Sequence, residues 1–194
     1  MIEFLKGDLY ESSPAHAVVD CGGVGYFLHI SLFTYVQIQG KKECRLFVHE
    51  VIREDTHELY GFASVDERWV FRKLVSVSGV GAGTGRMILS ALNPAEVRQA
   101  ILNGNSGIMK SIKGIGAKTA ERIIVDLRDK MSGDTSLLEI YAAGGNTARQ
   151  DALTALASLG IDRLKAEKTL DKILTSGSEE FRVEDLVKLA LKQL

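Results

Sequence analysis

The sequence lacks the marks of a secreted, membrane-spanning or metal-binding protein. Its first ten residues mix polar and apolar side chains, unlike a signal peptide, and no run of 18 apolar residues occurs. The two cysteines, Cys21 and Cys44, have no C-x-x-C spacing and no histidine cluster beside them, so we expect reduced thiols in a core. These absences predict a cytoplasmic protein with no metal, no cofactor and no membrane partner.

An excess of charge of one sign is also lacking overall, because the net charge is −1. The distribution is uneven. Residues 1–63 carry 5 Lys and Arg against 9 Asp and Glu, residues 64–131 carry 11 against 6, and residues 132–194 carry 8 against 10. The basic excess in the middle of the chain predicts a phosphate-binding module between two parts that do not bind a nucleic-acid backbone.

The basic middle part contains one stretch twice. The sequences VSGVGAGTGRMIL (77–89) and IKGIGAKTAERII (112–124) align at an offset of 35 positions. The aligned pairs are Gly79 with Gly114, Val80 with Ile115, Gly81 with Gly116, Thr84 with Thr119 and Ile88 with Ile123. A repeat at a fixed offset indicates one structural unit used twice. In the second copy the apolar spacing predicts a helix that begins near Lys118.

Each copy has two glycines around one β-branched residue. This G-x-G lets the backbone turn tightly, with its N–H groups outward at a helix N-terminus, where they suit phosphate. The pattern resembles the helix-hairpin-helix motif, which grips DNA phosphates through main-chain amides. Two hairpins packed only for stability are the alternative. Other glycine-rich sites fit poorly, because Thr119 stands where a P-loop beginning at Gly114 needs glycine, and Thr84 stands where a dinucleotide fingerprint beginning at Gly79 needs it.

The first 63 residues predict β structure. Five runs rich in Val, Ile, Phe and Tyr are separated by Gly, Pro, Asp and Lys, over residues 2–5, 17–21, 26–30, 44–52 and 58–62. Five short strands in this length suggest a small closed or partly open barrel. Gly22 and Gly23 suit a hairpin turn, since both tolerate positive φ. Glu54 and Asp55 predict an exposed acidic tip between the last two strands, for which an ordinary solvated turn is the alternative.

From Ser64 onward the apolar period becomes helical. Ser64 caps a predicted helix over 65–75, with Glu67 completing a capping box, and Asn93 with Pro94 begins a helix over 94–102. Residues 103–107 end that helix, and residues 108–112 lead into the second hairpin.

The rest of the chain predicts a tethered helical module. Residues 132–146 are rich in Gly, Ser and Ala, which is typical of a flexible linker. Thr147 caps the first of three helices, Gly160 closes it, and two amphipathic helices follow at about 163–174 and 183–194. This part contains no constellation of carboxylates or nucleophiles, so it predicts protein interaction rather than catalysis.

The predicted architecture is α+β, in four parts. They are a five-stranded, OB-like barrel over 1–63, a domain with two helix-hairpin-helix motifs over 64–131, the flexible linker over 132–146, and a three-helix bundle over 147–194. This order resembles the RuvA family, the Holliday-junction-binding subunits of the bacterial branch-migration machine, over the whole chain. The most telling segments are GGVGY at 22–26, RED at 53–55, LYGF at 59–62 and GIGAKTAER at 114–122.

The resemblance implies a non-catalytic scaffold that holds a four-way junction flat and open, independently of base sequence. It also implies a homotetramer or an octamer, whose residues 147–194 recruit the hexameric ATPase RuvB. Glu54 and Asp55 match the family's acidic pin at the junction centre. The matched DNA-binding positions are Gly79, Gly81, Thr84, Arg86, Gly114, Gly116, Lys118, Thr119 and Arg122. One position departs from the family pattern: Gly83 stands where a lysine is usual, so Arg86 must supply that charge or the first hairpin binds more weakly.

A DNA repair enzyme is the alternative function. DNA glycosylases use the same hairpin with a catalytic lysine placed like Lys118 and an aspartate beyond it, and Asp134 lies in that direction. Asp134, however, stands in the Gly/Ser linker, which cannot hold a carboxylate rigidly. No helical domain precedes the hairpins to form a pocket for a flipped base. The glycosylase or lyase interpretation is therefore the weaker one.

Overall fold

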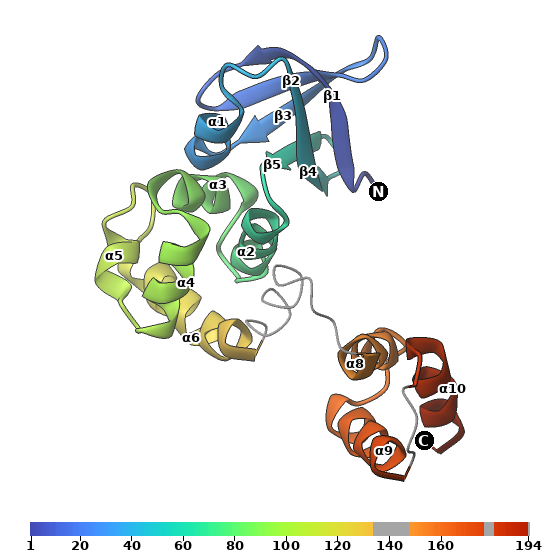
Figure 1. Ribbon diagram of the computed structural model, residues 1–194. Helices are drawn as coiled ribbons and strands as arrows, with labels where there is room; N and C mark the ends of the chain where they lie inside the picture. Colours follow the sequence, from blue (N-terminus) through green and yellow to red (C-terminus); the bar gives the residue numbers. More distant parts are fainter. Residues whose placement is uncertain (134–147, 177–180, 194) are drawn as a thin grey trace. The chain divides into compact units, whose positions relative to one another are not determined.

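The computed structural model describes residues 1–133, 148–176 and 181–193. The chain divides into two compact units, Met1–Asp134 and Thr135–Leu194 (Figure 1). The first unit contains a β barrel and a layer of helices, and the described residues of the second form three helices. The predicted fold class, α+β with a barrel, a helical middle part and C-terminal helices, is confirmed.

The first 62 residues form a closed five-stranded barrel with strand order β1-β2-β3-β5-β4. The strands are β1 (Phe4–Ser12), β2 (His16–Asp20), β3 (Gly25–Ile30), β4 (Glu43–Ile52) and β5 (His57–Phe62). Neighbours are antiparallel except β3 and β5, which pair in parallel and close the barrel. Alternate residues of β4 point inward, where Leu46 and Val48 are fully buried. The predicted first strand, 2–5, was too short, because β1 pairs with β4 over Phe4–Asp8 and continues as the partner of β2 over Asp8–Ser12.

Local turn chemistry was predicted well, whereas one helix was missed. Gly22 and Gly23 adopt φ values of 70° and 93° between β2 and β3, which confirms the hairpin turn. Helix α1 (Leu32–Ile38) follows β3, and Ser31 caps it by accepting a 3.0 Å hydrogen bond from the Thr34 N–H. Seven residues are too few for a helical apolar period to stand out in the sequence.

Five helices follow the barrel. They are α2 (Val65–Val75), α3 (Ala82–Ala91), α4 (Pro94–Leu102), α5 (Ser106–Lys110) and α6 (Ala117–Gly133). The bounds of α2 and α4 agree with the prediction, and Asn93 forms a full capping box with Glu96. The short helix α5 was not predicted. Helix α6 continues through Ser132 and Gly133, so these two residues, expected to begin the linker, are helical.

The capping box predicted at Ser64 is only half formed. Ser64 accepts from the Glu67 N–H at 3.0 Å, as expected for an N-cap. The Glu67 carboxylate, however, turns into the barrel interface and does not return to the Ser64 N–H. Tertiary contacts therefore override the local motif.

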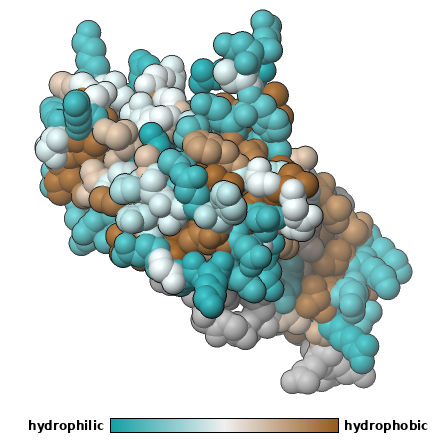
Figure 2. All heavy atoms as spheres, turned by 90° about the horizontal axis from the view of Figure 1, so that it is seen from above, coloured by the Kyte–Doolittle hydropathy of each residue, from teal (hydrophilic) through white to brown (hydrophobic). Residues whose placement is uncertain are grey.

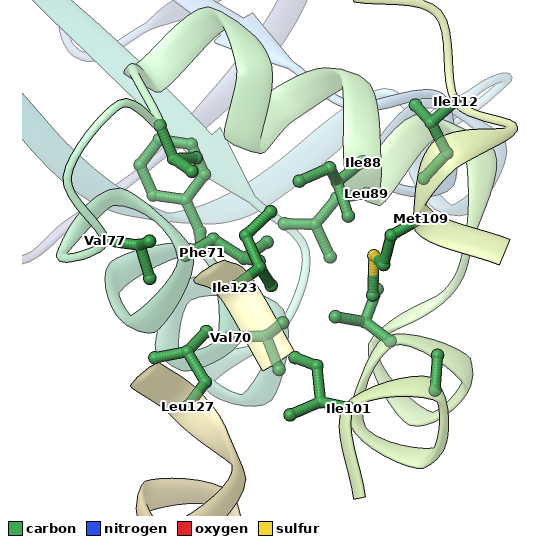
Figure 3. Packing of buried hydrophobic residues seen from close by; sticks show 14 of the residues in the cluster. Val70, Phe71, Val77, Ile88, Leu89, Ile101, Met109, Ile112, Ile123 and Leu127 are labelled. Atoms are coloured by element: carbon green, nitrogen blue, oxygen red, sulfur yellow. The ribbon is translucent and has the colours of Figure 1, made fainter. Parts of the chain in front are cut away.

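The two copies of the repeat pack around one core (Figure 3). Val70 and Phe71 of α2, Ile88 of α3, and Ile123 and Leu127 of α6 are fully buried there. The same core includes Tyr60 and Phe62 of β5, so the barrel and the helices share side-chain packing. This shared core places the barrel and both hairpins in one compact unit.

The second unit contains α8 (Ala148–Ser158), α9 (Arg163–Ser176) and α10 (Val183–Gln193). Its core is made of Ala152, Leu153, Leu156, Ala166, Leu170, Ile173, Leu186 and Ala190. Gly160 has a φ of 84° just beyond α8, in agreement with the predicted helix end. The predicted cap Thr147 and most of the predicted linker, residues 134–146, lie outside the described residues.

Candidate nucleic-acid interface

The first hairpin, residues 77–81, joins α2 to α3. Val77 donates to the Leu74 carbonyl at 3.1 Å, Val80 donates to the Val77 carbonyl at 3.0 Å, and Gly79 has a φ of 90°. Val77 and Val80 are buried, which anchors the turn from beneath. Helix α3 then begins after Gly81, which has no side chain to accept from the first-turn N–H groups. These amides are thus left to an external acceptor.

The second hairpin, residues 112–116, repeats this geometry between α5 and α6. Ile112 donates to the Met109 carbonyl at 3.3 Å, Ile115 donates to the Ile112 carbonyl at 3.1 Å, and Gly114 has a φ of 89°. Ile112 and Ile115 are buried as their counterparts are. The predicted repeat is therefore a structural repeat, down to individual backbone hydrogen bonds.

The hairpin glycines face open space. A Cβ atom added to Gly79, Gly81, Gly114 or Gly116 would meet no protein atom within 4 Å. Gly79 and Gly114 need glycine for their positive φ, whereas the backbone of Gly81, with a φ of −81°, suits any residue. Packing within the described protein therefore does not require glycine at Gly81 or Gly116. The lack of a side chain there leaves the N-terminus of each following helix accessible to a ligand.

Basic and hydroxyl side chains surround the second hairpin. Lys118 is exposed on the first turn of α6, and no hydrogen bond or ion pair holds it within the described residues. Thr119 is half-buried, as is its counterpart Thr84 in α3. Lys113 is also exposed, inside the turn itself; it was not among the predicted DNA-binding positions, although the repeated stretch contains it. This hairpin thus presents free cations next to its open amides.

Arg122 connects the two hairpins. Its Nη1 donates to the carbonyl of Ser78, in the first hairpin, at 3.3 Å. Helix α6, which begins at the second hairpin, therefore contacts the turn of the first one. The guanidinium remains exposed, so its other N–H groups can face a ligand that spans both hairpins.

Arg86 lies elsewhere than expected. Its Nη1 donates to the Ala15 carbonyl, in the turn between β1 and β2, at 2.8 Å. The charge expected to replace the lysine missing at Gly83 is therefore directed at the barrel. A DNA contact by Arg86 stays a prediction, and this structure gives the first hairpin less positive charge than the second.

The acidic tip, residues 53–56, closes the β4-β5 hairpin. The Arg53 N–H donates to the Thr56 carbonyl at 2.8 Å, and Glu54 and Asp55 are both exposed. The predicted exposed turn is thus present.

A cavity of about 380 Å³ lies between the base of the acidic tip and the first hairpin. One wall is the end of β4, from His49 to Arg53, and the opposite wall includes Val80, Gly81 and Ala82. Burial, with the nearby Arg72 and Arg68 charges, lowers the pKa of His49, so this wall favours a neutral imidazole. The base of the acidic tip and the first hairpin are therefore neighbours, which the sequence could not indicate.

Apolar surface does not single out an interface. Exposed apolar side chains come from several elements, including Tyr10 of β1, Phe27 of β3, Val36 of α1 and Val125 of α6. On the face drawn in Figure 2, hydrophilic residues are interspersed with small hydrophobic patches. None of the described helices has both the length and the hydrophobicity of a membrane span, and the described residues contain no cluster of His, Cys, Asp or Glu that suits a metal ion.

The alternative catalytic interpretation gains nothing from the structure. Lys118 projects from an exposed helix start and is not among the residues that line the cavity beside the first hairpin. Its proposed partner Asp134 lies outside the described residues. The geometry around Lys118 is that of a surface cation.

Comparison with known proteins decides the family. Residues 1–61 match the RuvA N terminal domain, residues 71–129 match the SAM-like helix-hairpin-helix tandem, and residues 147–194 match the RuvA C-terminal domain. The chain belongs to the RuvA family. This confirms the resemblance stated from the sequence.

Three RuvA relatives illustrate the similarity. The chain is 46% identical to a protein of Bacteroides thetaiotaomicron over 202 residues, 45% identical to one of Christiangramia forsetii over 194 residues, and 43% identical to one of Porphyromonas gingivalis over 203 residues. Each alignment covers 100% of both chains, and each relative is named Holliday junction branch migration complex subunit RuvA. The RuvA match extends over the barrel, the hairpins and the C-terminal helices alike.

Proposed function

We propose that this protein is a non-catalytic scaffold that binds four-way junction DNA by its backbone. The observation that carries the proposal is the pair of hairpins with the same hydrogen bonds and the same open glycines. Each turn offers first-turn amides at a helix N-terminus, which suit a phosphate oxygen. Two such turns joined through Arg122 suit successive phosphate contacts on one duplex arm.

The proposed contacts read shape and charge rather than bases. Main-chain amides and the Lys118 and Lys113 ammonium groups bind phosphate without regard to sequence. Gly79, Gly81, Gly114 and Gly116 provide the turns, and Thr84 and Thr119 lie on the first turns of the helices that follow. The second hairpin is the stronger of the two, because its lysines are free whereas Arg86 of the first copy contacts the barrel.

The junction itself is inferred from the RuvA relatives, which are named as Holliday junction branch migration subunits. We infer that several copies of this chain, as a homotetramer or octamer, hold the four arms open and planar. The exposed Glu54 and Asp55 would then meet at the centre, where their charges repel strand phosphates. The C-terminal module, residues 147–194, would recruit the RuvB ATPase, so that the motor activity resides in the partner.

A gel-shift and light-scattering comparison tests this proposal. The full chain is titrated into a four-way junction and into linear duplex of equal length, at one moderate salt concentration. We expect a strong preference for the junction, and complexes with at least four copies of the chain. Equal affinity for both DNAs would contradict the scaffold. A borohydride-trapped adduct on DNA with damaged bases would instead favour the lyase.

A further inference from the structure

The barrel and the helical layer meet at two adjacent charged residues of α2. Glu67 is 0% exposed and Arg68 is 5% exposed. Charged side chains are almost never buried so completely unless they are paired, and each buried charge needs partners to offset its lost hydration. The partners of both side chains lie in or next to the barrel.

Glu67 holds the side of the barrel that carries α1. Its carboxylate accepts from the Ser31 hydroxyl, from the Thr34 hydroxyl at 2.6 Å and from the Ala63 N–H at 3.1 Å. Ser31 and Thr34 form the capped first turn of α1. These three hydrogen bonds stabilise the ionised carboxylate, whereas burial has the larger effect and raises the pKa of Glu67.

Arg68 binds the part of the barrel where the chain enters β1 and lies beside β4. Its guanidinium donates to the Glu3 carbonyl at 2.8 Å and to the Val48 carbonyl at 3.2 Å, and it pairs with the Glu3 carboxylate. Neighbouring residues of one helix therefore bind two different parts of the barrel. Two separate attachments resist a rotation that one attachment would permit.

Both attachments lie next to parts that the proposed function requires. Val48 belongs to β4, which continues to Ile52 and then into the acidic tip. Helix α2 ends at Val75 and leads directly into the first hairpin. Six residues from Val48 to Glu54 span roughly 20 Å at about 3.3 Å per residue, so a small rotation at Arg68 would move the tip by several ångströms.

We propose that Glu67 and Arg68 are positioning residues that fix the acidic tip relative to the hairpins and thereby set the preference for junction over duplex. This inference rests on the proposed function. The hairpins alone bind any duplex arm, whereas discrimination needs the tip charges at a fixed place beside them. Loosening the attachment leaves the phosphate contacts intact and misplaces the charges that reject continuous duplex.

The test compares three variants with the parent protein. Arg68→Met keeps the aliphatic stem and removes all three donated contacts. Thr34→Val removes one donor to Glu67 at the other attachment, in the first turn of α1. Asp66→Asn is the matched control, because Asp66 is the preceding residue of α2 but its carboxylate pairs with Arg98 of α4, within the helical layer.

Affinities for junction and for linear duplex are measured for each protein, together with the thermal unfolding midpoint. We expect Arg68→Met and Thr34→Val to raise the affinity for linear duplex more than that for the junction, and so to lower the junction-to-duplex ratio by roughly 2- to 30-fold. Asp66→Asn keeps the parent ratio. In a background of Glu54→Gln with Asp55→Asn, the Arg68→Met change no longer alters the ratio, since there is no tip charge to misplace.

A role in stability alone predicts a different result. Partial unfolding lowers both affinities in proportion, so the ratio stays at the parent value while the unfolding midpoint falls. A variant that folds and keeps the parent junction-to-duplex ratio, with a lowered unfolding midpoint, overturns the positioning role. If Arg68→Met does not fold, Thr34→Val decides by the same ratio. A parent that binds both DNAs equally overturns the proposed function instead, and with it this assignment.

Discussion

The substitution Gly116→Ser is expected to stabilise the second hairpin and, at the same time, to weaken its binding of DNA. Gly116 precedes α6, and an added Cβ meets no protein atom within 4 Å, so the change causes no clash. Serine at an N-cap accepts from first-turn N–H groups, the same amides that we assign to phosphate. The helix should therefore gain about a few tenths of a kcal/mol relative to glycine while its anion site becomes occupied from within.

The expected reduction in affinity follows from this competition. A phosphate must displace a side-chain cap worth about 0.5–2 kcal/mol. Because about 1.4 kcal/mol corresponds to a tenfold change in affinity, this cost lowers DNA affinity by roughly 2- to 30-fold for each second hairpin that contacts the DNA. The slope of affinity against salt stays at the parent value, because serine removes no charge. Lys118→Ala, in contrast, should flatten that slope by about 0.9 for each phosphate that the protein no longer neutralises.

The assay is a salt series of duplex and junction titrations, with thermal unfolding of the same preparations. Gly107→Ser is the control for a serine added elsewhere in the helical layer: it lies in α5, where the Ile108 N–H is already bonded to Asn105 Oδ1 at 3.3 Å, and thermal unfolding checks its stability, because its Cβ meets that oxygen at 3.3 Å. We expect this control to bind DNA as the parent does. A Gly116→Ser protein that is as stable as the parent and binds DNA equally well would refute the assignment of the α6 amides to phosphate.

Three further outcomes are expected. Changing Glu54→Gln with Asp55→Asn should raise affinity for linear duplex more than for junction, because each exposed charge repels a phosphate about 4 Å away by about 1 kcal/mol in water; an unchanged ratio would make the tip an ordinary turn. Truncation after Gly145 should leave junction binding intact and abolish stimulation of RuvB ATPase, measured by phosphate release; undiminished stimulation would move the partner site into the remaining residues. Burial raises the folded-state pKa of Glu67, so its contribution to stability is present below its ordinary value of 4.5 and is lost as pH rises through the raised value. The Tm of the parent relative to Glu67→Gln should therefore rise as pH falls from about 7 toward about 5, and a pH-independent difference would contradict a buried titrating carboxyl.

The sequence by itself determined the features that arise within a few residues. The G-x-G turns, the helix bounds at Val65 and Pro94 and the glycine hairpin at Gly22 all followed from local backbone and capping rules, and the structure agrees with each. The repeat also predicted that both hairpins share one geometry. These features depend on short-range sterics and on hydrogen bonds between near neighbours, which residue type largely fixes.

Only the tertiary structure decided where the charged side chains outside the turns go. Glu67 looked like half of a capping box, but its carboxylate binds Ser31, 36 positions away. Arg86 was predicted to contact phosphate, which stays a prediction, and in the structure its Nη1 donates to the Ala15 carbonyl, 71 positions away. Partners so distant in sequence meet only when the barrel packs on the helices. The fully buried Glu67 then takes the donors that this packing supplies, because leaving its charge unpaired costs more than a local cap returns.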